Sequence, residues 1–421
     1  MTFTLGETRK IKYIATVNDD ALPDSTDPDW ELEYIDIGNV EAGTGITGTA
    51  MYRFEEAPSR ARRRVRHGDV VISTVRTYLQ AIAAIIDPPP NLIVSTGFAV
   101  IRPMPDKLDP GFCRYVLREP SFLAEVERRS TGVSYPAINA SDMAAIRVPF
   151  PPLDRQRAIA DYLDRETAKL DAMVAAKERL LDLLAEKRRA LITHAVTRGL
   201  NPTAPTKDSG IEWLGDIPAH WEILHLKRVL ASSTYGVSAS AGPVGAVPML
   251  RMGEIVNGEI DYSRLAYIDE VEASLLLQPG DLLFNRTNSL DQIGKVAIIR
   301  PTGVFPVTFA SYLVRLRVTE RVLAEFLNFS LNSSYVLSWA RSEAIPAIGQ
   351  ANLNPFRYGY LPLPLPPIEE QDDIITHLKE QCDRFSSLTA TTENSVALLR
   401  ERRAALIAAA VTGAIDVETA A

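Results

Sequence analysis

The chain carries at residues 151–200 the stretch PPLDRQRAIADYLDRETAKLDAMVAAKERLLDLLAEKRRALITHAVTRGL. It carries a second version at residues 366–415, PPIEEQDDIITHLKEQCDRFSSLTATTENSVALLRERRAALIAAAVTGAI. The two align without a gap at a shift of 215 positions, pairing Gln156 with Gln371 and Val196 with Val411, and both close on ALI-x-x-AVT. A match of this length does not arise by chance, so the chain is a tandem duplication.

Each copy has the pattern of one long helix. Large residues recur at alternating steps of four and three, the period of a coiled-coil seam. The double proline suits a helix start, and Gly199 and Gly413 lie where the helices should end. The predicted seam positions are Ile159, Leu163, Leu170, Met173, Leu180, Leu184, Leu191, Ile374, Leu378, Phe385, Leu388, Leu399 and Leu406. The alternative is that each helix packs only on its own globule, but so long a seam needs an equally long partner, and the other copy supplies it.

The regions before the helices also match, although more weakly. HGDVVIS from His67 resembles PGDLLFN from Pro279, and YPAIN from Tyr135 resembles IPAIG from Ile345. Short apolar, β-branched runs alternate there with brief helical stretches, which predicts mixed α/β globules in an overall α+β fold. The predicted division is a globule at 1–150, a helix at 151–200, a linker and second globule at 201–365, and a helix at 366–415.

Composition excludes several classes of protein. The chain has 421 residues with a formal net charge of −8, which is ordinary for a globular protein. Its two cysteines, Cys113 and Cys382, exclude a disulfide framework and favour a reducing cytoplasm. No signal peptide is expected at the N-terminus, and no apolar run approaches the 18 residues that a membrane span requires. The sequence therefore predicts a cytoplasmic protein that is not associated with a membrane.

Catalytic motifs are weak. Residues 43–48, GTGITG, formally match a dinucleotide loop, but no convincing helix follows, so we expect a turn between strands. Residues 87–90, DPPP, resemble the D/N-P-P-aromatic motif of amino-methyltransferases, yet Pro90 stands where the aromatic belongs. The five histidines lack metal spacing. The chain is therefore predicted to hold no catalytic residue, no metal and no cofactor of its own.

Basic and amide-rich segments are the remaining candidates for a function. Arginine suits phosphate groups and guanine edges, and loops rich in Asn, Ser and Thr suit base edges. The first globule is not basic overall, because residues 1–150 hold 17 Lys and Arg against 20 Asp and Glu. For any single loop residue a solvated surface is an equally good interpretation. The predicted DNA-binding residues are Arg60, Arg62, Arg63, Arg64, Arg66, Arg76, Thr77, Tyr78, Asn285, Arg286, Thr287 and Asn288.

The duplicated pattern resembles the specificity (S) subunits of type I restriction–modification systems. The resemblance rests on the double proline with its glutamine before each long helix, on EKRRALITHAVT from Glu186, and on DSGIEWLGDIPAHWEILHLKRV from Asp208. It covers essentially the whole chain. Two departures stand out: the N-terminus lacks a full counterpart of GIEWLGDIPAHW, and the second helix has Thr392 and Ser395 where the first has Lys177 and Leu180.

The resemblance implies two target-recognition domains separated by an antiparallel helix pair. Each domain would read one half of a bipartite, asymmetric site in double-stranded DNA, while the helices set the unread spacer and dock two methyltransferase (M) subunits. S-adenosylmethionine would belong to the M subunits, and ATP and Mg to restriction (R) subunits. The chain itself would be non-catalytic.

Two other functions stay open at this point. A protein-only coiled-coil scaffold would show no sequence-selective DNA binding, even with an M subunit present. A self-contained methyltransferase would bind S-adenosylmethionine, although the chain has no recognisable loop for that cofactor.

Overall fold

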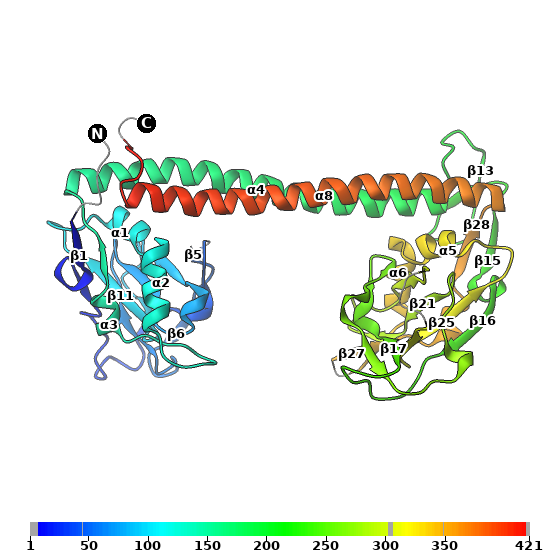
Figure 1. The fold of residues 1–421 in the computed structure, drawn as a ribbon, viewed down its shortest axis with the longest axis horizontal. Coiled ribbons are helices and arrows are strands. Elements are labelled where there is room, and N and C mark those ends of the chain that lie inside the picture. Colours follow the sequence, from blue (N-terminus) through cyan, green and yellow to red (C-terminus); the bar gives the residue numbers. More distant parts are fainter. Residues whose placement is uncertain (1–6, 44, 302–305, 348, 418–421) are drawn as a thin grey trace. The chain divides into compact units, whose positions relative to one another are not determined.

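The computed structural model describes residues 7–43, 45–301, 306–347 and 349–417. The chain divides into a first unit, residues 1–178 and 393–421, and a second unit, residues 179–392. Both boundaries fall inside long helices, α4 (Leu153–Arg198) and α8 (Ile368–Val411), so each unit contains one part of each helix (Figure 1). The helices were predicted at 151–200 and 366–415.

Each unit contains its own four-stranded antiparallel sheet, and the strand order is the same in both. In the first unit its order is β2 (Ala15–Val17), β11 (Phe98–Pro103), β8 (Val70–Ser73) and β9 (Ile82–Ala84). In the second unit the same order is kept by β16 (Leu230–Tyr235), β25 (Leu313–Val318), β21 (Leu282–Asn285) and β23 (Val296–Ile298). The central strands β8 and β21 are buried along their whole length, as near-continuous apolar runs predict.

A second sheet distinguishes the units. In the second unit it has three strands, β20 (Ala266–Ile268), β17 (Val247–Leu250) and β24 (Thr308–Phe309). In the first unit it has four, β6 (Ala50–Arg53), β3 (Glu31–Ile35), β10 (Leu92–Ser95) and β7 (Ala61–Arg64). β7 has no counterpart in the three-stranded sheet, and it carries three of the predicted DNA-binding arginines.

Short helices and small ladders complete each unit. The helices are α1 (Pro110–Val116), α2 (Pro120–Arg129) and α3 (Ala140–Ala144) in the first unit, and α5 (Ala324–Leu331), α6 (Ser334–Glu343) and α7 (Pro355–Tyr358) in the second. The ladders are β1 (Thr8–Lys10) with β12 (Arg147–Pro149), β4 (Val40–Glu41) with β5 (Gly45–Ile46), β13 (Thr206–Asp208) with β14 (Asp216–Pro218), β15 (Glu222–His225) with β28 (Pro362–Leu365), β18 (Ile255–Val256) with β19 (Glu259–Ile260), and β22 (Thr287–Asn288) and β26 (Ile345–Ala347) with β27 (Gln350–Asn352). The GTGITG stretch joins β4 to β5, as expected for a turn between strands, although Thr44 lies outside the described residues.

A buried glutamine fixes the start of each long helix. Gln156 is fully buried, and its Nε2 donates to the carbonyls of Lys107 (3.0 Å) and Pro151 (2.8 Å) while its Oε1 accepts from Asp109 N–H (2.9 Å). Gln371 repeats this arrangement with Arg321 (3.1 Å), Pro366 (2.9 Å) and Leu323 (2.8 Å). The glutamine of each repeat therefore ties three backbone groups together where the globule meets its helix.

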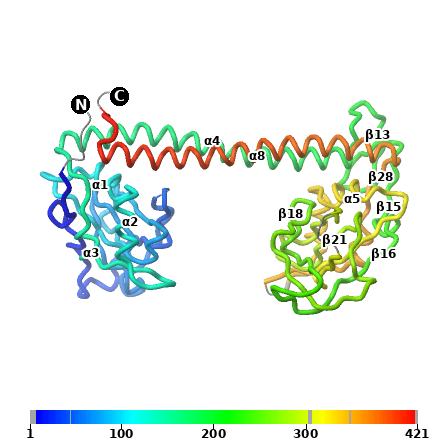
Figure 2. The backbone as a smooth tube through the Cα atoms, viewed as in Figure 1, coloured from blue at the N-terminus to red at the C-terminus, as the bar shows by residue number. Residues whose placement is uncertain are grey.

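Within each unit the two long helices run side by side in opposite directions (Figures 1 and 2). In the first unit Arg403 Nε donates to Asp171 Oδ1 at 2.7 Å, and Arg400 pairs with Glu178 at 2.7 Å. In the second unit the core joins Ala195 and Val196 near the end of α4 to Ile374 near the start of α8. The expected antiparallel pairing is present in both units.

The seam differs from the predicted one at alternate positions. Leu163, Leu170, Leu184 and Leu378 are buried, but Met173, Leu180 and Leu388 are 52%, 43% and 53% exposed, which corrects their assignment. The next residues, Val174, Leu181 and Thr389, are half-buried instead. The residues at steps of seven from them are buried or half-buried too: Thr167, Arg188, Cys382, Val396 and Arg403. A seam can alternate steps of four then three or of three then four residues, and the two patterns have every seventh residue in common. Side chains suitable for a seam occupy the remaining positions of both patterns, so the sequence alone could not distinguish them.

Among the described residues, no helix is long and apolar enough to cross a membrane.

Candidate nucleic-acid interface

The arginine run of the first unit is an edge strand rather than a free basic loop. β7 pairs antiparallel with β10, with Arg63 opposite Val94. Arg62 is half-buried, with its guanidinium 4.6 Å from the centre of the Phe54 ring. Burial lowers the pKa of Arg63, whose Nε has no hydrogen-bond partner among the described residues. Arg62 and Arg63 are thus held largely by the fold, while Arg64 and Arg60 are exposed.

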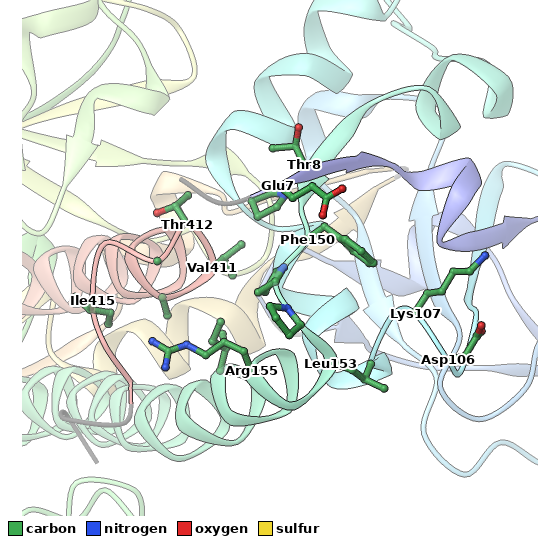
Figure 3. Close-up of a pocket in the computed structure, with 16 residues that line it drawn as sticks. Glu7, Thr8, Asp106, Lys107, Phe150, Leu153, Arg155, Val411, Thr412 and Ile415 are labelled. Atoms are coloured by element: carbon green, nitrogen blue, oxygen red, sulfur yellow. The ribbon is translucent and has the colours of Figure 1, made fainter. Parts of the chain in front are cut away.

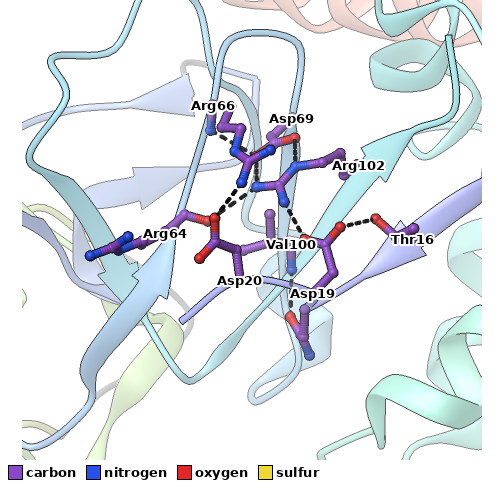
Figure 4. Close-up of polar contacts among 9 residues, drawn as sticks. Thr16, Asp19, Asp20, Arg64, Arg66, Asp69, Val100 and Arg102 are labelled. Atoms are coloured by element: carbon purple, nitrogen blue, oxygen red, sulfur yellow. Dashed lines mark hydrogen bonds and ion pairs between the residues drawn. The ribbon is translucent and has the colours of Figure 1, made fainter. Parts of the chain in front are cut away.

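The last arginine of that run belongs to a structural network (Figure 4). Arg66 donates to Asp20 at 2.6 Å, and its backbone N–H donates to Asp69. Asp69 is buried and forms a two-point ion pair with Arg102 at 2.9 and 2.8 Å. Asp281 and Arg317 repeat that pair in the second unit at 2.7 and 3.2 Å. The repeated Gly-Asp sequence before each central strand therefore encodes a turn held by a buried ion pair.

A strained turn after β8 displays Arg76. Arg76 and Gln80 adopt the left-handed conformation, with φ of 51° and 49°, on either side of a short 3₁₀ turn. Thr77 inside that turn is buried and hydrogen-bonds Ser130 at 2.8 Å, so its prediction as a DNA contact is corrected. Left-handed residues other than glycine are costly, and two of them in one turn persist only where the surroundings impose them. The turn leaves Arg76 and Tyr78 exposed.

Arg76 lies in a groove with an aromatic neighbour that the sequence did not identify. Its guanidinium stands 5.0 Å from the centre of the Tyr135 ring, and Tyr135 is 65% exposed. The groove has a volume of about 850 Å³. Its lining residues are Asp36, Ile37, Gly38, Val40, Glu41, Ala42, Arg60, Val75, Arg76, Leu79 and Tyr135. Cationic donors, an exposed ring and apolar side chains are the groups that contact base edges.

The second unit places an arginine over a tyrosine at the corresponding strand end. Arg286 directly follows β21, and its guanidinium lies 5.2 Å from the centre of the Tyr235 ring. Its Nη2 donates to Asn352 Oδ1 at 3.2 Å. Asn285 is 1% exposed and points into the fold, so its prediction as a DNA contact is also corrected. The half-buried Thr287 and Asn288 form the short strand β22 beside β27.

Asn288 borders a polar groove of the second unit. The lining residues are Arg251, Met252, Gly253, Glu254, Ile255, Val256, Asn257, Asn288, Gln292 and Lys295. Amide donors and acceptors lie here beside two cations, a composition that suits both base edges and phosphates.

The sequence missed Tyr135, Tyr235 and Asn352. Each lies far along the chain from the arginine that it contacts, so no local pattern joins them. The signal that was available is an exposed tyrosine beside a turn residue, in SYP at 134–136 and in TYG at 234–236 at the end of β16.

A separate cavity lies at one end of the helix pair in the first unit (Figure 3). It has about 290 Å³ of space between the start of α4 and the end of α8, and Phe150, Ile159 and Val411 are among its lining residues. In the second unit the repeat-related Ile374 and Val196 pack in one core with fully buried Trp221, whose Nε1 donates to Glu370 at 3.0 Å. The first repeat has no described counterpart of that tryptophan.

Metal-ligating side chains and thiols are two further kinds of group that could carry chemistry. No cluster of three or more His, Cys, Asp or Glu residues that could hold a metal ion occurs among the residues described. Both cysteines are free and buried, and burial raises the pKa of the Cys113 thiol, which keeps it neutral and unreactive.

Comparison with known proteins gives a consistent family. Residues 46–181 match the family described as "Type I restriction modification DNA specificity domain". The EcoKI specificity subunit of Escherichia coli K12 is 23% identical over 322 residues, covering 75% of this chain and 68% of the relative. The putative MjaX specificity subunit of Methanocaldococcus jannaschii is 28% identical over 196 residues, covering 45% of each chain.

Solved structures show the same fold. A chain from a type I restriction–modification assembly superposes with a TM-score of 0.77 at 19% identity, covering 98% of this chain and 100% of the other. The HsdS subunit of Thermoanaerobacter tengcongensis superposes with a TM-score of 0.53 at 20% identity, covering 97% of both chains.

Proposed function

We propose that the chain is a specificity (S) subunit of a type I restriction–modification system, because residues 46–181 match that family's DNA specificity domain and the fold is shared. Each unit carries one target-recognition domain, and each domain reads one half of a bipartite, asymmetric site in double-stranded DNA. The long helices α4 and α8 set the number of unread base pairs between the two halves.

The arginines that follow the two central strands are the observation that carries this proposal. Arg76 follows β8 and Arg286 follows β21, each in its own unit's four-stranded sheet, and each lies beside a tyrosine that comes from a non-equivalent segment of the chain. The sheet order is repeated, whereas the groove lined by Arg76 and the groove lined by Asn288 have different side chains. A common scaffold with different surface chemistry is what two different half-sites require.

Exposed apolar side chains on the long helices support docking of two M subunits. Met173 and Leu183 on α4 correspond through the repeat to Leu388 and Leu398 on α8, and all four are between 48% and 65% exposed. Exposed large apolar residues at repeated positions mark interaction surfaces. The duplication therefore offers one such face per repeat, for two copies of the same partner.

The chemistry is assigned to partner subunits. We propose that the M subunits supply S-adenosylmethionine and methylate adenine, that R subunits, where present, supply ATP- and Mg-dependent cleavage, and that this chain is non-catalytic. A cytoplasmic location is part of the same proposal and agrees with two free, buried cysteines.

The test is a methylome of a host that expresses this chain with its M subunit. We expect a split adenine-methylated motif that disappears when this chain alone is deleted. The control is a host with both genes and a catalytically inactive M subunit, which should show no motif. An unchanged methylome on deletion of this chain, with the M subunit active, would favour the coiled-coil scaffold instead.

A further inference from the structure

We infer that Arg76 and Arg286 each read a guanine in the major groove, one in each half of the DNA site. The inference rests on the proposed function and adds to it the base that each domain selects. It also separates these two arginines from the other cations of the two domains.

Arg76 is held in position yet keeps its hydrogen-bond donors free. Its guanidinium contacts the Tyr135 ring but makes no hydrogen bond or ion pair within the described part of the chain. The ring lies beside the guanidinium and leaves its hydrogen-bond donors open. The backbone is fixed as well, because the left-handed Arg76 and Gln80 enclose a turn anchored by buried Thr77. The side chain therefore presents a planar fork whose position is set before DNA arrives.

Arg286 is also held in position with free donors, but by different partners. Tyr235 fixes its plane, and Asn352 Oδ1 takes one donor of Nη2 at 3.2 Å. A longer contact joins Nη1 to the Ser311 carbonyl at 3.4 Å. A guanidinium has five N–H donors, and Nε of Arg286 is buried without a partner in the described part of the chain, so the second N–H of Nη1 and of Nη2 remain for a ligand. Tyr235 is 51% exposed, so the stacked pair is reachable from solvent.

The donor geometry selects guanine over the other bases. Guanine presents two acceptors, O6 and N7, side by side in the major groove, and the arginine fork can donate to both. Adenine pairs its N7 acceptor with an N6 donor, and cytosine presents an N4 donor, so both place an N–H against the cation. Phosphate contact alone would not require a fixed plane.

The other predicted arginines of the first domain lack this combination: Arg60 is exposed and lines the same groove, but its guanidinium has no aromatic contact among the described residues. Arg62 and Arg63 are half-buried in β7, and Arg66 is paired with Asp20. Arg64 is exposed but does not line the groove that holds Arg76. Arg64 is therefore the matched control.

The experiment uses the chain assembled with its M subunit and duplexes that carry the methylome-derived motif. One guanine at a time is replaced by 7-deazaguanine, which removes the N7 acceptor and keeps base pairing. We expect one such replacement in each half-site to weaken binding roughly 10- to 100-fold. Arg76→Ala should abolish that penalty in one half-site only, and Arg286→Ala in the other only. Arg64→Ala should change neither.

The salt dependence separates base reading from phosphate contact. Lysine keeps the positive charge, so the slope of binding affinity against salt should be unchanged in Arg76→Lys. A half-site without guanine, or a 7-deazaguanine penalty that survives Arg76→Ala and Arg286→Ala, would overturn the inference. Failure of the proposed function is distinguishable, because the unsubstituted assembly would then show no split motif at all.

Discussion

At the scale of single residues, Gln156 and Gln371 connect sequence to fold most directly. Replacing Gln371 by Ala leaves the Leu323 N–H and two carbonyls without their partner in a site closed to water. We expect a loss of about 1–3 kcal/mol in the free energy of unfolding, measured by urea denaturation. Gln371→Glu should be no better, because a carboxylate has no N–H for the carbonyls and brings a charge into the core.

The exposed Gln278 of the same unit provides the control, since Gln278→Ala removes a solvated side chain. Its free energy of unfolding should change by less than about 0.5 kcal/mol. Equal effects of the two alanine variants would show that the buried glutamine does not hold the start of α8.

Residue-level prediction from sequence worked where partners are local and failed where they are distant. The turn between β4 and β5 and the glycines near the helix ends follow from local chemistry. The DNA-binding role predicted for the whole arginine run does not fit its structure, because alternate arginines of a strand can lie against the sheet. A run of five arginines does not reveal that Arg63 is partly buried. Arg76 carried no local signal of its role, because Tyr135 reaches it only through the tertiary fold.

At the scale of elements, the helix seam can be tested with two adjacent leucines. Leu184 is 8% exposed and Leu183 is 48% exposed, so the same substitution samples the two faces of α4. Leu184→Ala should lower the free energy of unfolding by about 2–4 kcal/mol, and Leu183→Ala by less than about 0.5 kcal/mol, in chemical denaturation. The reverse order would place Leu183 rather than Leu184 in the seam, against both the sequence pattern and the structure.

The exposed leucine has a separate expected role. Leu183→Asp should leave the chain folded but weaken assembly with the M subunit, because it puts a charge on an apolar contact face. Size-exclusion chromatography of the mixed subunits would measure the loss. Normal assembly of Leu183→Asp together with its repeat counterpart Leu398→Asp would remove these positions from the docking surface.

At the scale of the whole molecule, duplication accounts for the order of the elements. Sheet order, the glutamine contacts and the Asp–Arg turn recur in both units, so one repeat serves as an internal control for the other. The sequence predicted this organisation because helix periodicity and the 215-residue shift are long-range regularities that survive divergence. Strand β7 was not predictable in this way, because only one unit has it.

The continuous helices predict a spacer that can be lengthened by design. Seven residues inserted after Ala175 and another seven after the repeat-related Ala390 extend each helix by about 10 Å at 1.5 Å per residue. Seven residues are one full heptad, so the seam keeps its phase on both sides of each insertion. Because DNA rises about 3.4 Å per base pair, the unread spacer should grow by about three base pairs while both half-sites stay the same. The methylome of the host measures this outcome.

Seven Gly and Ser residues inserted after Pro202, outside both helices, should leave the spacer unchanged. A changed half-site in the heptad variant would mean that the helices do more than set the distance.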